Sequence, residues 1–108
     1  MALYGLHAKD PGVGAADALR GAREMLARMD QLNSRLRGDL LQPLRIGIGI
    51  HFGEAIVGAM GPPGSQIVSA IGETANACSR LEGLTKRYDC RVVVSQRAAE
   101  RLAWMSET

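Results

Sequence analysis

The chain of 108 residues is poor in aromatic side chains and in net charge. It contains one Trp, two Tyr and one Phe, and its 13 basic and 11 acidic residues leave a formal net charge of +2. Proteins that bind nucleic acid need a basic face for the phosphates and often use aromatic rings to stack on bases. The composition therefore argues against a nucleic-acid partner. A hydrophobic content of 46% is that of an ordinary globular domain and argues against disorder.

Cysteines and long apolar runs are equally scarce. Cys78 and Cys90 form neither a CxxC pair nor a disulfide framework, so we expect two small buried thiols in a reducing, cytoplasmic compartment. No apolar run approaches the roughly 20 residues of a membrane-spanning helix. The first residues also lack the basic region, apolar core and cleavage site of a signal peptide. The sequence therefore predicts no membrane segment within these residues.

The first half of the chain has a helical period. After Asp10 and Pro11, a plausible helix start, apolar residues recur at alternating steps of three and four until Gly38 signals a stop. These positions are Ala15, Ala18, Ala22, Met25, Met29, Leu32 and Leu36. One face of an α/β core and a short coiled coil both fit this pattern. We favour the core, because about three turns of the repeat are too few to prefer a coiled coil.

The second half has mostly strand patterns. Residues 44–51 alternate aliphatic residues with Gly, Arg and His, and the glycines leave one face of this expected strand open to close approach. The tight connection at 52–54 predicts a hairpin with a second strand over 55–60. Residues 66–71 and the β-branched run at 90–95 are further expected strands.

Two helices and one more strand complete the expectation. One helix contains Asn76 and Arg80 and ends near Arg87, and another covers Arg97 to Trp104. Met1–Leu6 is apolar from the first position, which predicts a strand already under way.

The segment Gly72–Glu82 carries the chemically most informative pair. Asn76 and Arg80 are four residues apart, so a helix projects them from one face, with Glu73 one turn earlier. Arg offers five donors and a permanent charge for phosphate oxygens, and an Asn amide can both donate to and accept from a ribose. Without further context, the ordinary interpretation of such a pair, a solvated helix face, is favoured.

Other candidate side chains are weaker. His51 ends its expected strand without an acidic or cysteine partner at metal-ligand spacing, so we interpret it as structural. Nothing adjacent to Cys78 indicates an activated thiol, which favours packing over reactivity. Glu54 and Glu73 are two carboxylates near the motifs.

Two separated motifs give the pair its context. The first is the run RIGIGIHFGEAIVG at residues 45–58, and the second is IGET at 71–74 followed by Asn76, Arg80, Leu81 and Glu82. Together they closely resemble the second half of the catalytic domain of class III nucleotidyl cyclases, the adenylate/guanylate cyclase family. The resemblance runs in order from Met1 to about Trp104. It implies an α/β (α+β), ferredoxin-like domain with an antiparallel-rich sheet, which dimerises head to tail and has its active sites between the subunits.

The resemblance also implies an activity. The family converts a nucleoside triphosphate to a 3′,5′-cyclic monophosphate and pyrophosphate with two divalent ions, Mg²⁺ or Mn²⁺. Asn76 would orient the ribose, and Arg80 would stabilise charge on the α-phosphate. Ser69 resembles the purine-selecting position. Its hydroxyl favours ATP over GTP without rejecting guanine, and a plain strand serine is the alternative.

The chain departs from the family at the metal site. The family's two metal-binding aspartates precede the segment that resembles residues 1–5, and its closing strands and a phosphate-contacting Lys lie beyond the position of Thr108. We therefore assign no metal ligand and expect residues 1–108 to be a truncated cyclase domain that is inactive alone. It would supply ribose and α-phosphate contacts to an adenylate cyclase of intracellular signalling, in a homodimer or with a partner cyclase chain. The alternative is a non-catalytic cyclase-like module for dimerisation or regulation.

Overall fold

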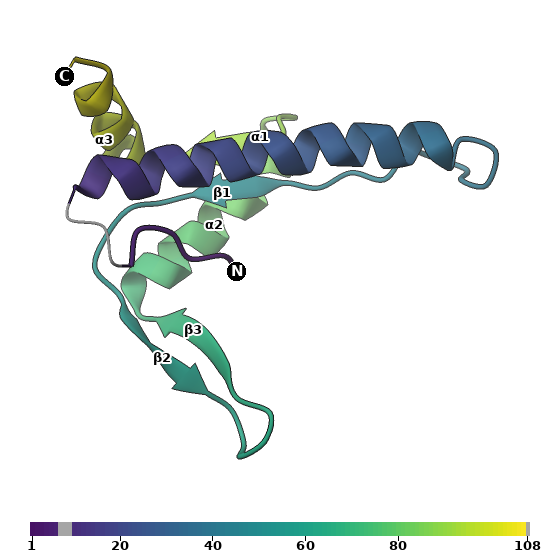
Figure 1. Cartoon of the computed structure of the whole chain (residues 1–108). Helices are drawn as coiled ribbons and strands as arrows, with labels where there is room; N and C mark the ends of the chain where they lie inside the picture. Colours follow the sequence, from purple (N-terminus) through teal and green to yellow (C-terminus); the bar gives the residue numbers. More distant parts are fainter. Residues whose placement is uncertain (7–9, 108) are drawn as a thin grey trace.

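The computed structural model describes residues 1–6 and 10–107. Over this part the elements are α1 (Pro11–Arg35), β1 (Ile48–Ile50), β2 (Ile56–Met60), β3 (Ile67–Ile71), α2 (Glu73–Arg87), β4 (Val92–Val94) and α3 (Gln96–Glu107). β1 pairs in parallel with β4, and β2 pairs antiparallel with β3 (Figure 1). The expected mixed α/β class is confirmed, and the ferredoxin-like arrangement stays a prediction.

Helix α1 begins where the sequence predicts and packs mainly through its first half. The Asp10 carboxylate caps the helix by accepting a hydrogen bond of 2.9 Å from the Gly12 N–H. Ala15 and Ala22 are buried, and α1 contacts both β1 and α3. Further along, Met25 and Leu32 stay 45% and 36% exposed. The core interpretation of this helix therefore holds for its first half.

The core is small and lies where α1, β1 and α3 meet. Its buried centre is Ala22, Ile50 and Ala98. Partly buried side chains surround it: Ala18, Leu19, Ile48, Phe52, Val92 and Val94. Because two of the three buried residues are alanines, the fully buried centre contains little apolar area.

Helix α2 lies directly against the glycine face of β1. A Cβ atom on Gly49 would lie 2.5 Å from the Glu82 backbone nitrogen and 2.8 Å from the Cys78 carbonyl oxygen, and one on Gly47 would overlap the Thr85 hydroxyl. The Cys78 thiol donates to the Gly49 carbonyl at 3.2 Å. The expected close approach to the bare strand face is thus confirmed, and the approaching element is a helix backbone.

The strand pairing differs from the prediction. β1 covers only residues 48–50 of the expected 44–51, and the predicted hairpin with 55–60 is wrong, because β4 pairs with β1 and β3 pairs with β2. Residues 52–54 lack a two-residue turn sequence such as Asn-Gly, and the Glu54 carbonyl accepts a hydrogen bond from Thr74 of α2. The turn of the observed hairpin is 61–65, where Gly61 (φ 118°) and Gly64 (φ 85°) take conformations that suit glycine.

The predicted strand at Met1–Leu6 is also wrong. This segment packs on α1 instead of pairing with a strand: Gly5 approaches the Gly14 backbone, and the Tyr4 hydroxyl occupies the place that a Gly21 Cβ would need. Two glycines on α1 therefore open a surface on which the first residues lie.

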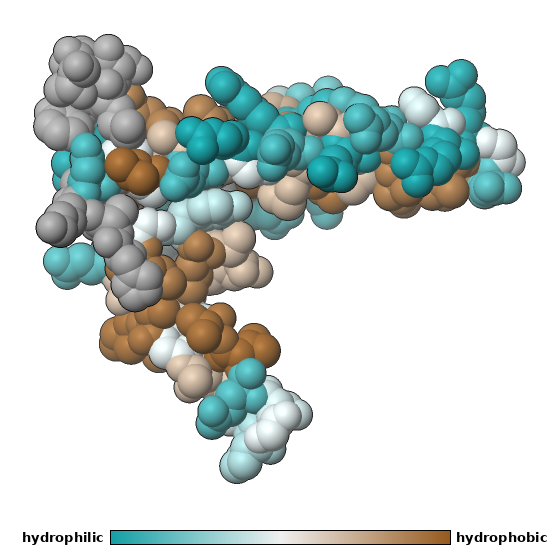
Figure 2. Space-filling view, viewed as in Figure 1, coloured by the Kyte–Doolittle hydropathy of each residue, from teal (hydrophilic) through white to brown (hydrophobic). Residues whose placement is uncertain are grey.

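The β2–β3 hairpin extends away from the core (Figure 1). Its apolar side chains lie on the surface (Figure 2), with Ile56, Ile67 and Val68 each about two-thirds exposed. The two strands are therefore held mainly by each other.

Two further expectations concern the thiols and the membrane. Cys78 and Cys90 are free and partly buried. No helix within residues 1–6 and 10–107 combines the length and apolar character that crossing a membrane requires. A cytoplasmic location stays a prediction.

The glycine contact can be tested by adding a single methyl group. We expect Gly49→Ala to lower the free energy of unfolding by about 3 kcal/mol, because helix backbone cannot move aside as a flexible side chain would. Gly83 lies on α2 with open space around its Cβ position, so Gly83→Ala should raise the free energy of unfolding by about 0.5–1 kcal/mol. Urea unfolding followed by circular dichroism measures both. Equal effects of the two substitutions would contradict this packing.

Candidate functional site

Two of the three predicted site residues, Asn76 and Arg80, lie on the exposed side of α2. Cys78 and Thr85 face β1, and with 3.6 residues per turn Asn76 and Arg80 lie about 160–200° around the helix from Cys78. Both side chains are exposed, and their Cα atoms are about 6 Å apart along the axis. The packing of α2 on the glycine face thus presents Asn76 and Arg80 together to solvent.

The chain enters α2 through a turn that a glycine allows. Gly72 has φ 117° and directly precedes the helix, and its carbonyl accepts the Asn76 N–H at 3.1 Å. Asn76 is therefore in the first part of the helix. Its side-chain amide makes no hydrogen bond within the described part of the chain.

Arg80 is held by an ion pair on the surface. Its Nη2 lies 2.5 Å from Glu73 Oε1, and the two side chains are 67% and 77% exposed. Water and salt screen such a pair, so it contributes at most about 1 kcal/mol. Glu73 holds the guanidinium on the surface of α2. Because the pair is weak, a polyanion with several charges could displace Glu73 from Arg80.

Ser69 lies on a different element. It is partly buried on β3 and opposite Gly58 of β2. A Cβ atom on Gly58 would have open space around it, so the strand face beside the Ser69 hydroxyl is free. Among the described residues, no hydrogen bond joins Ser69 to Asn76 or Arg80. The hairpin thus carries Ser69, α2 carries the other two, and Gly72 connects them.

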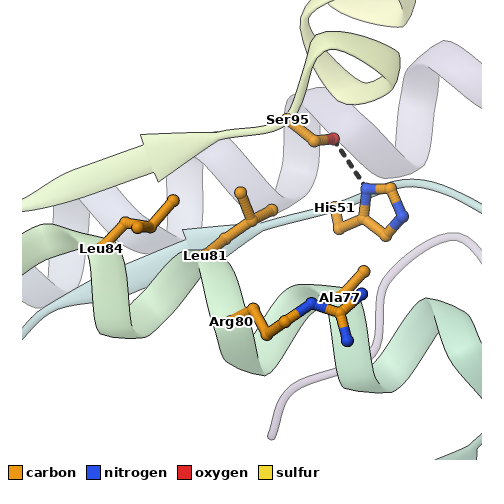
Figure 3. Close-up of a pocket in the computed structure, with 6 residues that line it drawn as sticks. All are labelled: His51, Ala77, Arg80, Leu81, Leu84 and Ser95. Carbon is orange, nitrogen blue, oxygen red and sulfur yellow. Dashed lines mark hydrogen bonds between the residues drawn. The ribbon is translucent and has the colours of Figure 1, made fainter.

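An open depression of about 400 Å³ adjoins Arg80 (Figure 3). It is lined by His51, Ala77, Arg80, Leu81, Leu84 and Ser95. His51 Nδ1 and Ser95 Oγ share a hydrogen bond of 2.8 Å, and Ser95 Oγ also accepts the Ala98 N–H at 3.2 Å. The structural interpretation of His51 is therefore supported, because Ser95 anchors its ring to the start of α3.

Sequence reasoning missed the part that Ser95 plays. A serine directly before a helical run is the usual N-cap signal, so the sequence contained an indication of the bond to Ala98. No local pattern predicts the bond to His51, which joins residues 44 positions apart.

The divalent ions that the resemblance implies do not fit the residues present. Within residues 1–6 and 10–107, no three His, Cys, Asp or Glu side chains are close enough together to hold a metal ion. Glu73 is paired with Arg80, and Glu54 is exposed in the loop before β2. The described residues therefore offer an exposed guanidinium at Arg80 but no cluster of metal donors.

Comparison with known proteins finds similarity to three adenylate cyclases. The chain is 38% identical over 81 residues to adenylate cyclase 1 of Rhizobium meliloti (strain 1021). This match covers 75% of the chain. It is 33% identical over 90 residues to the adenylate cyclase of Anabaena cylindrica, and 28% identical over 93 residues to the terminal-differentiation specific adenylate cyclase of Dictyostelium discoideum. These matches cover 80% and 86% of this chain. This stretch of chain is adenylate cyclase-related.

The cyclase-related chain corresponds to a small part of these relatives. The matches cover 12%, 18% and 4% of their respective lengths. No family model matches the chain, and no solved structure matches it. The resemblance seen in the two motifs is confirmed, and the roles of Ser69, Asn76 and Arg80 stay predictions.

The anchoring role of Ser95 leads to a stability prediction. We expect Ser95→Ala to lower the free energy of unfolding by about 1–2 kcal/mol, because the Ala98 N–H and the His51 ring lose their common partner. Ser79→Ala, at an exposed position of α2, should change the free energy of unfolding by less than about 0.5 kcal/mol. Thermal or urea unfolding measures the difference, and an unchanged stability of Ser95→Ala would show that the cap is not needed.

Proposed function

We propose that residues 1–108 supply the ribose and α-phosphate contacts of an adenylate cyclase active site that a second chain completes. One observation carries the proposal: the chain is related to adenylate cyclases, and its fold presents Asn76 and Arg80 together on the exposed side of α2.

The chemistry of cyclisation fits these two side chains. The 3′-oxygen of ATP attacks the α-phosphorus, the new O–P bond forms, and the bond to the β-phosphate oxygen breaks to release pyrophosphate. The 3′-hydroxyl proton leaves to an acceptor on the second chain. Negative charge gathers on the non-bridging α-phosphate oxygens, where the guanidinium of Arg80 would stabilise it with little reorganisation. The amide of Asn76 would bind the ribose and align its 3′-oxygen.

Arg80 would change partners when the nucleotide binds. In the structure its guanidinium is neutralised by Glu73 across the surface of α2. A triphosphate carries more negative charge than one exposed carboxylate and can also accept two hydrogen bonds from a guanidinium. The ion pair therefore orients the cation before binding and gives way to the substrate.

Ser69 would select the purine. Its hydroxyl lies beside the open space at Gly58, which leaves room for a flat base against β2 and β3. A serine hydroxyl can accept from the adenine amino group, so ATP is the proposed substrate and GTP the less favoured one.

The second chain is a partner cyclase chain that carries the metal-binding carboxylates. A homodimer of residues 1–108 would present two copies of Asn76 and Arg80 but no cluster of acidic donors among its described residues. The complex would therefore be a mixed pair. A non-catalytic cyclase-like module for dimerisation or regulation is the second candidate.

Complementation tests the proposed function. The chain is mixed with a cyclase domain that retains both metal aspartates but lacks the Asn/Arg pair, and cyclic AMP is measured by mass spectrometry with Mg²⁺ or Mn²⁺ and ATP. We expect activity from the mixture and from neither chain alone. Arg80→Ala should lower the rate by about 100-fold or more, because the α-phosphate charge loses its cation. Asn76→Ala should lower it as well.

The matched control is Arg87→Ala, which removes the same charge near the end of α2 and should leave the rate nearly unchanged. A folded mixed dimer without activity, or activity that Arg80→Ala does not change, would exclude the proposal and favour the non-catalytic module.

A further inference from the structure

The hairpin that carries Ser69 joins the rest of the fold at two places (Figure 1). One is the segment 51–55 that leads into β2, and the other is Gly72 between β3 and α2. Gly72 has φ 117°, and a Cβ atom there would have open space around it. Beside Gly72, β3 contacts α2, and the small side chain of Ala70 is buried. The other connection, through the segment 51–55, is where side-chain hydrogen bonds can set the angle of the hairpin.

Thr74 ties this segment to α2. Its hydroxyl donates to the Glu54 carbonyl, 20 residues earlier in the chain. A threonine in the first turn of a helix often bonds to nearby backbone, whereas this bond joins α2 to a distant segment of the chain. A Cβ atom on Gly53 would lie 2.7 Å from Thr74 Oγ1, which means that the bond needs a glycine at position 53.

The same segment is tied to α3 by two further contacts. His51 bonds to Ser95 at the start of α3, and the guanidinium of Arg101 lies 5.0 Å from the centre of the Phe52 ring. Residues 51 and 52 are thus held by α3. The Thr74 bond is the contact nearest to β2, where the hairpin begins.

We propose that Thr74 is a positioning residue: its hydroxyl sets the angle of the β2–β3 hairpin relative to α2, and with it the distance from Ser69 to Asn76 and Arg80. The inference rests on the proposed function for its catalytic consequence, because one nucleotide must meet Ser69 with its base and the α2 pair with its ribose and phosphate. The geometric part stands on the contacts of residues 53, 54 and 74.

The test compares Thr74→Val, which keeps the shape but loses the hydroxyl, with Thr74→Ser, which keeps the hydroxyl. The first readout is a set of residual dipolar couplings of backbone N–H groups in the full chain. In Thr74→Val, the couplings of β2 and β3 should no longer fit the alignment of α2 and α3, while Thr74→Ser should retain the fit. Gly53→Ala should act like Thr74→Val, because it displaces the Thr74 hydroxyl.

The second readout is the ratio of kcat/KM for ATP and GTP in the complemented mixture. We expect Thr74→Val to lower this ratio about tenfold, as misplacing one selective hydrogen bond would do, and Thr74→Ser to restore it. Thr85→Val is the control. It also loses a hydroxyl of α2, one bonded to the Glu82 carbonyl and remote from the hairpin, so it should lower stability without altering the hairpin couplings or the ratio.

The outcomes separate the two proposals. Unchanged hairpin couplings in Thr74→Val, or a Thr74→Ser variant that behaves like Thr74→Val, would overturn the positioning role. If the wild-type mixture makes no cyclic nucleotide, the proposed function fails, and the couplings still decide whether Thr74 holds the hairpin.

Discussion

The rest of the structure depends on the contact between the backbone of α2 and the glycine face of β1. With no side chain at Gly49, the Cys78 carbonyl and the Glu82 nitrogen come within reach of the strand backbone, and the Cys78 thiol bonds to the Gly49 carbonyl. This contact fixes the rotation of α2 about its own axis. Because Cys78 must face the strand, Asn76 and Arg80 must face away from it. The glycines around β1 therefore decide which side of α2 faces solvent.

The sequence predicted the features that depend on neighbouring residues. The helix start at Asp10, the positions of α2 and α3, and the bare face of the strand around Gly49 all follow from local periodicity and residue type, and the structure confirms them. Strand pairing was predicted wrongly because it depends on residues distant in the chain. β1 pairs with residues 92–94, and no local signal distinguishes this partner from the nearer residues 55–60.

In the candidate site, too, the features that depend on neighbouring residues were predicted and those that depend on distant residues were not. The spacing of Asn76 and Arg80 predicts that they share a helix face, and the structure places both on the exposed side of α2. The bonds that support this site join residues far apart: His51 to Ser95 over 44 positions and Thr74 to Glu54 over 20. Such contacts arise only when the elements pack, so sequence patterns could not predict them. The cyclase-related chain thus combines a locally encoded pair of exposed polar side chains with contacts that only the fold creates.

The central claim is that a nucleotide meets the chain at Ser69, Asn76 and Arg80. Its most direct test is to titrate the isotope-labelled chain, in the mixed pair, with 3′-deoxy-ATP, which lacks the attacking hydroxyl and cannot cyclise. The account predicts that the side-chain N–H signals of Asn76 and Arg80 and the backbone amide of Ser69 shift together at one nucleotide concentration. Shifts confined to other parts of the chain, or none at saturating nucleotide, would contradict it.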